Sequence, residues 1–294
     1  MMQVEEKLHR CADATEAFLK EYLTTEDTDL ASLYEAMRYS VLAGGKRIRP
    51  FLVQETCRML GGDLSVGMFY AAALECLHTY SLIHDDLPCM DNDDFRRGKP
   101  TNHKIYGEAV ATLAGDALLT GAFELLSAAP ATPEQNGYAT AVLATSAGAE
   151  GMIGGQIMDL AAEEKEIDFD TLVKLHTKKT GALFRAAVQL GAIAANVAPG
   201  EGAWDALSVY AGNLGLAFQV IDDILDAYGD PQAMGKATHS DSKDGKITFL
   251  SFYSREDAKA QVQMLTEHAV AAITEIPESE TLVCLAQSLA ERTR

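Results

Sequence analysis

Two clusters of aspartate, far apart in the chain, hold the side chains most able to carry out chemistry. Breakers follow both, at Pro88 and in segment 229–231, so each cluster is expected near the C-terminal end of a helix. There the carboxylates repel one another, and the helix dipole also disfavours their charge. A divalent cation would relieve both penalties, so the clusters predict a metal site. Its candidate ligands are Asp85, Asp86, Asp91, Asp222, Asp223 and Asp226.

The donor types favour Mg²⁺ as that metal. All candidate ligands are carboxylate oxygens, and no cysteine or histidine pair has the spacing of a zinc site. Mg²⁺ keeps several waters and usually binds a few carboxylates together with the phosphates of a substrate. A calcium loop fits poorly because its ligand alternation and central glycine are missing. One cluster alone would be as well explained as a solvated acidic helix end, but two make that explanation much weaker.

Basic residues that can bind an anion gather in two segments. Segment 44–50, Gly-Gly-Lys-Arg-Ile-Arg-Pro, is a glycine turn followed by three cations and a proline suited to the first turn of a helix. Cations beside a helix N-terminus form an anion site, for which diphosphate is the natural ligand. Segment 96–100, Arg-Arg-Gly-Lys-Pro, follows the first acidic cluster, and its alternative role is to balance the neighbouring aspartates.

Two long helices are predicted to carry the aspartates. Apolar residues recur at helical spacing over residues 65–86 and 203–228. His78 and Ser81 share a face of the first helix with Asp85, and Gln219 shares a face of the second with its three aspartates. These faces are expected to line a polar cavity, although a polar stripe more often faces solvent and a lone histidine is more often structural.

Other polar residues interrupt the apolar pattern. Segment 179–181, Lys-Thr-Gly, breaks an apolar helix, where a kink would aim the lysine inward. Lys236 and Lys246 follow the second cluster, although either alone would be ordinary on a surface. The glycines of segment 151–155 are expected to allow close helix packing, and Asp116 is expected to be a buried, hydrogen-bonded carboxylate.

Composition predicts an all-α protein. The 294 residues contain many Ala and Leu, few β-branched runs and no linker or repeat, so we expect a single domain over residues 1–294. A net charge of −19 makes nucleic acid an improbable partner. No apolar stretch is expected to span a bilayer and the N-terminus has no signal-peptide pattern, so the chain is expected to be soluble and cytoplasmic, without stable membrane insertion.

Taken together, these motifs resemble those of the trans-isoprenyl diphosphate synthases over nearly the whole chain, most closely the bacterial farnesyl diphosphate synthases. The resemblance implies an isoprenoid synthase helical bundle around a deep central cavity, usually as a homodimer, with the acidic clusters facing each other across its mouth. The motifs that carry it occur in family order at segments 44–50, 84–98, 179–181, 218–226 and 245–249.

The resemblance also implies a role for each site residue. All six aspartates would hold Mg²⁺. The allylic diphosphate would be bound by Arg96, Lys179, Thr180, Gln219 and Lys236, with Lys246 assisting. Isopentenyl diphosphate would be bound by Lys46, Arg49, His78 and Arg97. The residues expected to be catalytic are Asp85, Asp86, Arg96, Lys179 and Asp222.

The reaction implied is the condensation of isopentenyl diphosphate with dimethylallyl or geranyl diphosphate to give farnesyl diphosphate. Tyr80 and Ser81, about one helical turn before the first cluster, would set the length of the product. The alternative role for Tyr80 is that of an ordinary residue of the hydrophobic core. Three alternatives stay open: a geranylgeranyl diphosphate synthase, a non-catalytic regulatory subunit, and, less well supported by the paired basic segments, a terpene cyclase.

Overall fold

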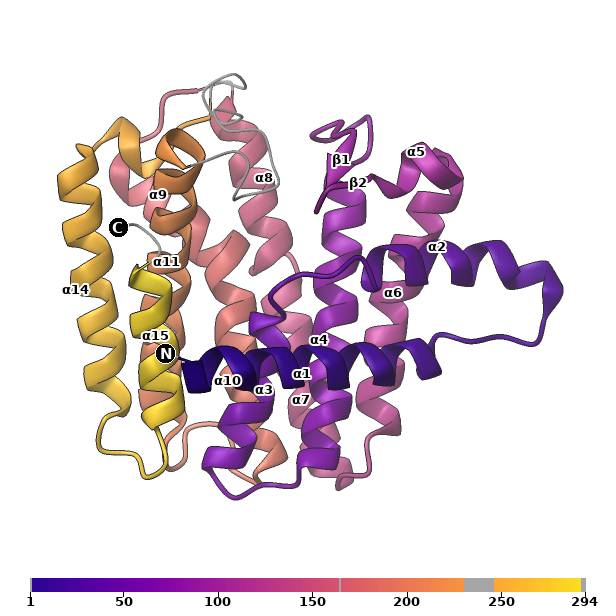
Figure 1. Cartoon of the computed structure of the whole chain (residues 1–294), viewed down its shortest axis with the longest axis horizontal. Helices are drawn as coiled ribbons and strands as arrows, with labels where there is room; N and C mark the ends of the chain where they lie inside the picture. The colour runs from indigo at the N-terminus through magenta and orange to yellow at the C-terminus, as the bar shows by residue number, and fades with distance from the viewer. Residues whose placement is uncertain (1, 164, 230–245, 292–294) are drawn as a thin grey trace.

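The computed structural model describes residues 2–163, 165–229 and 246–291, and these are almost entirely helical, as predicted (Figure 1). The elements of the first half are α1 (Met2–Tyr22), η1 (Thr28–Leu30), α2 (Ala31–Val41), α3 (Ile48–Met59), α4 (Leu64–Asp85), β1 (Phe95–Arg96), β2 (Lys99–Pro100), α5 (Asn102–Tyr106), α6 (Glu108–Ala128) and α7 (Pro133–Ala147). Those of the second half are α8 (Met152–Glu163), α9 (Phe169–His176), η2 (Thr177–Gly181), α10 (Ala182–Ala194), α11 (Trp204–Tyr228), η3 (Phe249–Ser251), α14 (Arg255–Ile273) and α15 (Glu280–Ala290).

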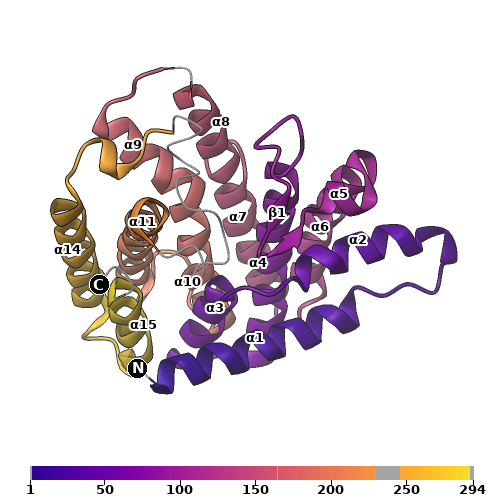
Figure 2. The same cartoon turned by 45° about the horizontal axis from the view of Figure 1, so that its top comes forward.

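Helices α4, α10 and α11 form the middle of the bundle. Helix α4 packs against α3, α6 and α10, while α11 packs against α10 and α14. Helices α1 and α2 cross the other helices as an arm that extends beyond the body of the bundle (Figures 1 and 2). The β1–β2 ribbon that follows α4 and the C-terminal end of α11 lie at the same end of the bundle (Figure 1).

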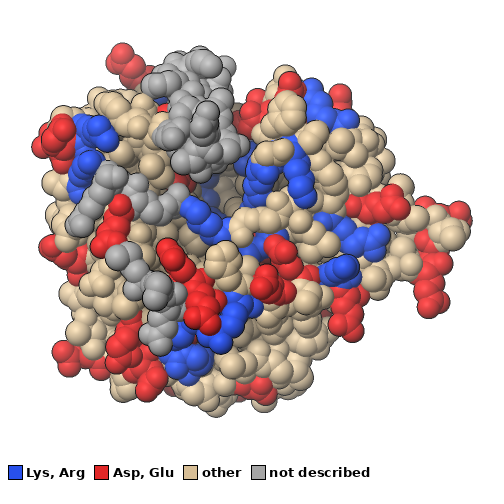
Figure 3. Space-filling view, in the orientation of Figure 1, with Lys and Arg blue, Asp and Glu red and all other residues tan. Residues whose placement is uncertain are grey.

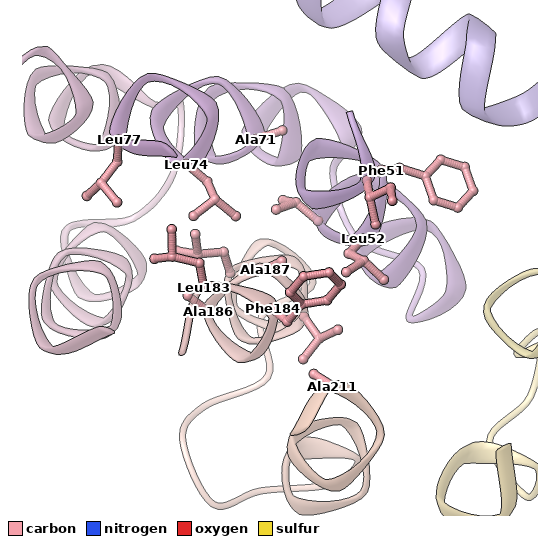
Figure 4. Packing of buried hydrophobic residues seen from close by; sticks show 14 of the residues in the cluster. Phe51, Leu52, Ala71, Leu74, Leu77, Leu183, Phe184, Ala186, Ala187 and Ala211 are labelled. Atoms are coloured by element: carbon pink, nitrogen blue, oxygen red, sulfur yellow. The ribbon is translucent and has the colours of Figure 1, made fainter. Parts of the chain in front are cut away.

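Buried apolar residues form one continuous cluster from Val4 to Leu289. Its centre is the junction of α3, α4, α10 and α11, where Leu52, Leu74 and Phe184 face one another (Figure 4). A continuous core of this kind favours the predicted single domain, which stays a prediction.

The two helices predicted to carry the aspartates are confirmed as α4 and α11. Asp63 caps the start of α4, its carboxylate accepting a hydrogen bond from the backbone N–H of Ser65 at 2.8 Å. Helix α4 ends at Asp85, just before Pro88, which lacks the N–H that a further helical turn requires.

The predicted interruption at segment 179–181 is also confirmed, as the π-helical turn η2. Such a turn inserts an extra residue into a helix and redirects the side chains that it carries. Helix α8 approaches this turn closely at Gly155, where a Cβ atom would lie 2.2 Å from the backbone nitrogen of Lys179. Glycine is therefore required at this crossing.

Helix α6 corrects the expectation that no segment is long enough to span a bilayer. By length and composition alone, α6 would be able to cross a membrane. The core helices of soluble proteins pass the same test, and α6 packs along α4 through small and apolar residues that include Ala111, Ala114 and Leu118. Helix packing therefore accounts for the apolar residues on one side of α6, while Leu113 stays exposed.

Gly191 sets the distance between α3 and α10. A Cβ atom there would lie 2.5 Å from the carbonyl oxygen of Val53 and 2.7 Å from Cβ of Thr56. We expect Gly191→Ala to lower the free energy of unfolding by about 1–3 kcal/mol in a denaturant titration, because the two backbones must separate. The matched variant Gly137→Ala, in α7 with open space around it, should instead gain about 0.5–1 kcal/mol. Equal effects of the two variants would refute this account of the α3–α10 crossing.

Candidate functional site

The first acidic cluster begins where α4 ends. Asp85 is the last residue of the helix, Asp86 is its C-cap, and the backbone N–H of Asp91 donates to the Asp85 carbonyl at 2.8 Å. This bond turns the chain back, so that Asp91 comes close to the helix end. A local turn therefore returns Asp91 to within electrostatic range of Asp85 and Asp86.

Asp86 is held by the ribbon that follows the turn. Its carboxylate accepts hydrogen bonds from Nε of Arg96 at 2.7 and 2.9 Å, and Nη2 of Arg96 lies 2.6 Å from Oδ1. Asp86 is buried, which raises its pKa, while Arg96 acts in the opposite direction. The pair fixes the acidic loop to β1.

Asp85 carries a carboxylate in an unfavourable environment. Burial raises its pKa to about 6, with Lys179 opposing the shift and the negative charge of Asp91 adding to it. Its side chain accepts no hydrogen bond from the described residues. A cation beside it would remove this electrostatic cost.

The second cluster is tied to the segment that ends at η3. Asp223 is buried, and its two oxygens accept hydrogen bonds from Nε2 of Gln219 at 3.0 Å and from the backbone N–H of Phe249 at 2.8 Å. Thr180 donates to Oε1 of Gln219 at 3.2 Å, which links this cluster to η2. Gln219 and Thr180, both predicted site residues, therefore lie side by side.

Two of the three lysines predicted to bind the allylic diphosphate lie beside acidic residues. Nζ of Lys179 donates to Oδ2 of Asp159, on α8, at 2.5 Å. Nζ of Lys246 lies 3.8 Å from Oδ1 of Asp91, which joins the segment after the second cluster to the first cluster. Lys236 lies outside the described residues.

A polar cavity of about 320 Å³ brings the basic segments together. Five cationic and two anionic residues line it, with the side chains of Arg47 and Glu75 almost fully buried behind the others, so its charge suits a polyvalent anion. They are Lys46, Arg47, Arg49, Arg96, Arg97, Glu75 and Asp222. Figure 3 shows Lys and Arg side chains gathered around a hollow on this face of the molecule.

Arg49 and His78 form the floor of the polar cavity. Nη1 of Arg49 lies 3.3 Å from Nε2 of His78, and its guanidinium lies 5.0 Å from the ring centre of Phe184. Burial, followed by the charges of Arg49 and Arg97, holds the pKa of His78 well below its usual value, so the ring is neutral and its Nε2 accepts a hydrogen bond from Arg49. Burial lowers the pKa of Arg49 to about 10, so it stays charged, and its buried Nε has no partner among the described residues.

An apolar cavity of about 390 Å³ adjoins the polar one. Both predicted chain-length residues line it: Tyr80, whose ring packs edge-on against His84 at 5.6 Å, and Ser81. Side chains of α8, including Ile153 and Ile157, form the opposite wall. The cavity therefore runs down the side of α4 behind Asp85.

The two cavities share Arg49, His78, Leu82 and Thr180. Asp85 lines the apolar cavity and Asp222 lines the polar one, so each cluster contributes a residue to one of the two adjoining cavities. Among the described residues, however, no three acidic, histidine or cysteine side chains are close enough to hold a metal by themselves. A metal here would need ligands from a bound molecule as well, which is the usual mode of Mg²⁺.

Three acidic residues depart from the sequence-based picture. Asp116 was expected to be buried, and that is wrong: its side chain is 58% exposed, 3.8 Å from Nε2 of His84. Glu75 in the polar cavity and Asp159 beside Lys179 were not predicted as site residues. Their spacing gave a usable signal, because Glu75 stands one turn before His78, and Asp159 one turn after Gln156, another lining residue.

Comparison with known proteins links this geometry to one family. The family model described as polyprenyl synthetase matches residues 30–282. The farnesyl diphosphate synthase of Escherichia coli is 42% identical over 293 residues, which cover 99% of this chain and 98% of that protein. A geranylgeranyl diphosphate synthase of Cyanophora paradoxa is 46% identical over 244 residues, 81% of this chain and 79% of that protein. The crystal structure of a Helicobacter pylori geranyltransferase, complexed with magnesium and isoprenyl diphosphate, superposes with a TM-score of 0.88 at 34% identity, covering 98% of each chain.

The raised pKa of Asp85 predicts how stability depends on pH without divalent metal. A carboxyl whose pKa is about 6 when folded and 3.8 ordinarily destabilises the folded state above about pH 6, and this cost disappears below about pH 4. Asp85→Asn should therefore raise the free energy of unfolding at neutral pH by roughly 1–3 kcal/mol, but not near pH 4. Chemical denaturation at both pH values measures this. Asp116→Asn, at an exposed carboxylate, should change little at either pH, and a gain for Asp85→Asn that is the same at both would contradict the assignment.

Proposed function

Since the chain belongs to the polyprenyl synthetase family, we propose that it is a prenyltransferase that condenses isopentenyl diphosphate with dimethylallyl and then geranyl diphosphate. Its product is (2E,6E)-farnesyl diphosphate, and diphosphate is released. The observation that carries the proposal is the junction of a cationic cavity, which Asp222 lines, with an apolar cavity, which Asp85 lines. That junction suits substrates with a diphosphate head and a hydrocarbon tail.

The cationic cavity is the proposed site of isopentenyl diphosphate. Lys46, Arg49 and Arg97 line it, and the buried Nε of Arg49 has hydrogen-bonding capacity that the described residues do not use. A buried cation of this kind is favourable when an anion completes its hydrogen bonds. His78 stays neutral and orients Arg49 through its Nε2 atom.

The allylic substrate would place its diphosphate at the junction and its tail in the apolar cavity. Lys179, Thr180, Gln219 and Arg96 lie around this junction and would bind the diphosphate, with Lys236 and Lys246 contributing from the segment after the second cluster. Tyr80 and Ser81 would face the growing end of the tail.

The carboxylates fit Mg²⁺, on the strength of the raised pKa of Asp85 and the all-oxygen donor set. The proposed ligands are Asp85, Asp86, Asp91, Asp222, Asp223 and Asp226. When bound, Mg²⁺ would neutralise charge on the departing diphosphate as a Lewis acid. Because Asp86 and Asp223 already accept hydrogen bonds from Arg96 and Phe249, they would have to share their oxygens with the metal or its waters.

The side chains around the junction support charge separation in the reaction. Lys179 and Arg96 stabilise negative charge as the allylic carbon–oxygen bond breaks and its electron pair leaves with diphosphate. The double bond of isopentenyl diphosphate then attacks the allylic cation, forming the new carbon–carbon bond. Loss of a proton, which the released diphosphate accepts, completes the product. The apolar walls of the tail cavity exclude water that would quench the cation.

A geranylgeranyl diphosphate synthase is the second candidate, because the chain also matches relatives of that name. The two enzymes would share the site described here and differ at the closed end of the tail cavity. The edge-on packing of Tyr80 against His84 favours an early stop to chain growth.

We also propose that the enzyme acts in the cytoplasm as a homodimer of single-domain chains. An apolar side chain on α6 supports the dimer, because Leu113 is more than half exposed. A second copy is the proposed cover for it. The acidic surface gives no support for an anionic membrane or nucleic acid as partner.

An assay of the purified protein tests the proposed activity. Isopentenyl and dimethylallyl diphosphate with Mg²⁺ should give farnesyl diphosphate, identified by mass, and chelation of the metal should abolish turnover. Asp85→Asn, which is expected to fold, should reduce kcat at least about hundredfold, because it removes a proposed ligand of the Mg²⁺ that would neutralise charge on the leaving group. Asp94→Asn, at an exposed aspartate paired with Lys104, is the control and should keep its activity. A parent protein inactive with Mg²⁺ and both substrates would instead indicate a regulatory subunit.

A single substitution tests the end of the tail cavity. Tyr80→Ala should shift most of the product to geranylgeranyl or longer diphosphates, because it removes the ring that limits the tail. Tyr138→Ala in α7, at a tyrosine that does not line the cavity, should leave the distribution unchanged. If Tyr80→Ala gives the same products as the parent, Tyr80 is a core residue and does not limit the chain.

A further inference from the structure

Arg47 lies among the basic residues of segment 44–50 but is engaged within the protein. Its side chain has no exposed surface. It donates to Glu75, to the carbonyl of Val41 and to Oε1 of Glu16, the last at 2.8 Å from Nη2. Its hydrogen-bonding capacity is therefore used inside the fold.

The backbone around Arg47 is in an uncommon conformation. Arg47 has a φ of +48°, in the left-handed region that side chains rarely adopt, and Gly44 and Gly45 before it have φ of +86° and +125°. Because glycine has no side chain, Gly44 and Gly45 allow this segment many backbone conformations. A strong contact is needed to select one conformation, and the buried contacts of Arg47 supply it.

Glu75 provides the inner half of that contact from α4. It is only 2% exposed and stands one helical turn before His78, which contacts Arg49. One face of α4 therefore meets Arg47 through Glu75 and Arg49 through His78. Lys46 and Arg49, on either side of Arg47, line the polar cavity.

We propose that Glu75 is a positioning residue for the isopentenyl diphosphate site, acting through its buried ion pair with Arg47 to direct Lys46 and Arg49 into the polar cavity. The proposal rests on the function proposed above. In it Glu75 touches no substrate, and Arg47 is an anchor that does not bind the diphosphate.

The sign of one kinetic effect separates this role from simple electrostatics. Glu75 is an anionic residue in a cavity that would bind an anion. If only its charge mattered, its removal would strengthen the binding of isopentenyl diphosphate. If it positions the cations, its removal weakens that binding, since Lys46 and Arg49 lose their alignment.

The decisive variant replaces both partners, Arg47→Met with Glu75→Leu. Apolar residues of similar size usually preserve folding when they replace a buried ion pair, and the local net charge does not change. We expect the KM for isopentenyl diphosphate to rise roughly tenfold, which corresponds to weakening one charge-assisted hydrogen bond. The KM for geranyl diphosphate and kcat should stay within about twofold of the parent, because the allylic site is untouched.

Glu75→Gln is the companion variant, and Glu55→Gln is its matched control. Glu55 is also buried, at 6% exposed, and pairs with Arg58 at 2.8 Å, but it does not line the polar cavity. Glu75→Gln should raise the same KM, whereas Glu55→Gln should leave it unchanged even where its thermal unfolding midpoint falls as far.

The outcomes distinguish the two proposals. An active parent together with an unchanged or lower KM for isopentenyl diphosphate in the double variant overturns the role of Glu75 alone. An equal rise in both KM values, or a rise in Glu55→Gln as well, shows a general structural effect and also overturns it. A parent that does not use isopentenyl diphosphate overturns the proposed function, and this inference with it.

Discussion

Charges of both signs are held partly out of water at one end of an apolar bundle, and the arrangement of the site follows from that constraint. Burial raises the pKa of Asp85 and lowers those of Arg49 and His78, so each group would be stabilised by a partner of the opposite charge or by a hydrogen bond. Within the fold, Arg96 compensates the charge of Asp86 through their ion pair. A bound metal and a bound diphosphate would supply the remaining opposite charges.

Because the polar and apolar cavities adjoin, the charged groups of the site lie beside an apolar space. Both cavities are lined by Arg49, His78, Leu82 and Thr180, so the cationic and apolar surfaces meet at these side chains. A reaction that separates charge next to a hydrocarbon chain needs such a boundary, because the diphosphate needs countercharge and the carbocation needs shelter from water.

Unusual backbone geometry positions the charged groups. Arg47 and Arg97 both have positive φ, and Lys179 lies in a π-helical turn that Gly155 allows α8 to approach. A positive φ is costly in isolation, and that of Arg47 is held by its buried ion pair with Glu75. This ion pair lies behind the residues that would meet substrate.

The amino-acid sequence by itself determined the helical class, the two helices that end in aspartate, and the existence of a helix break at Lys179, because helical periodicity and breakers act locally. The motifs also identified the candidate site residues, whose roles stay predictions. Only the tertiary structure decided that Arg47 points inward to Glu75 while its neighbours line a cavity, and that Asp116 is exposed. Which way a charged side chain points depends on partners distant in the chain, and local spacing carries no record of those partners.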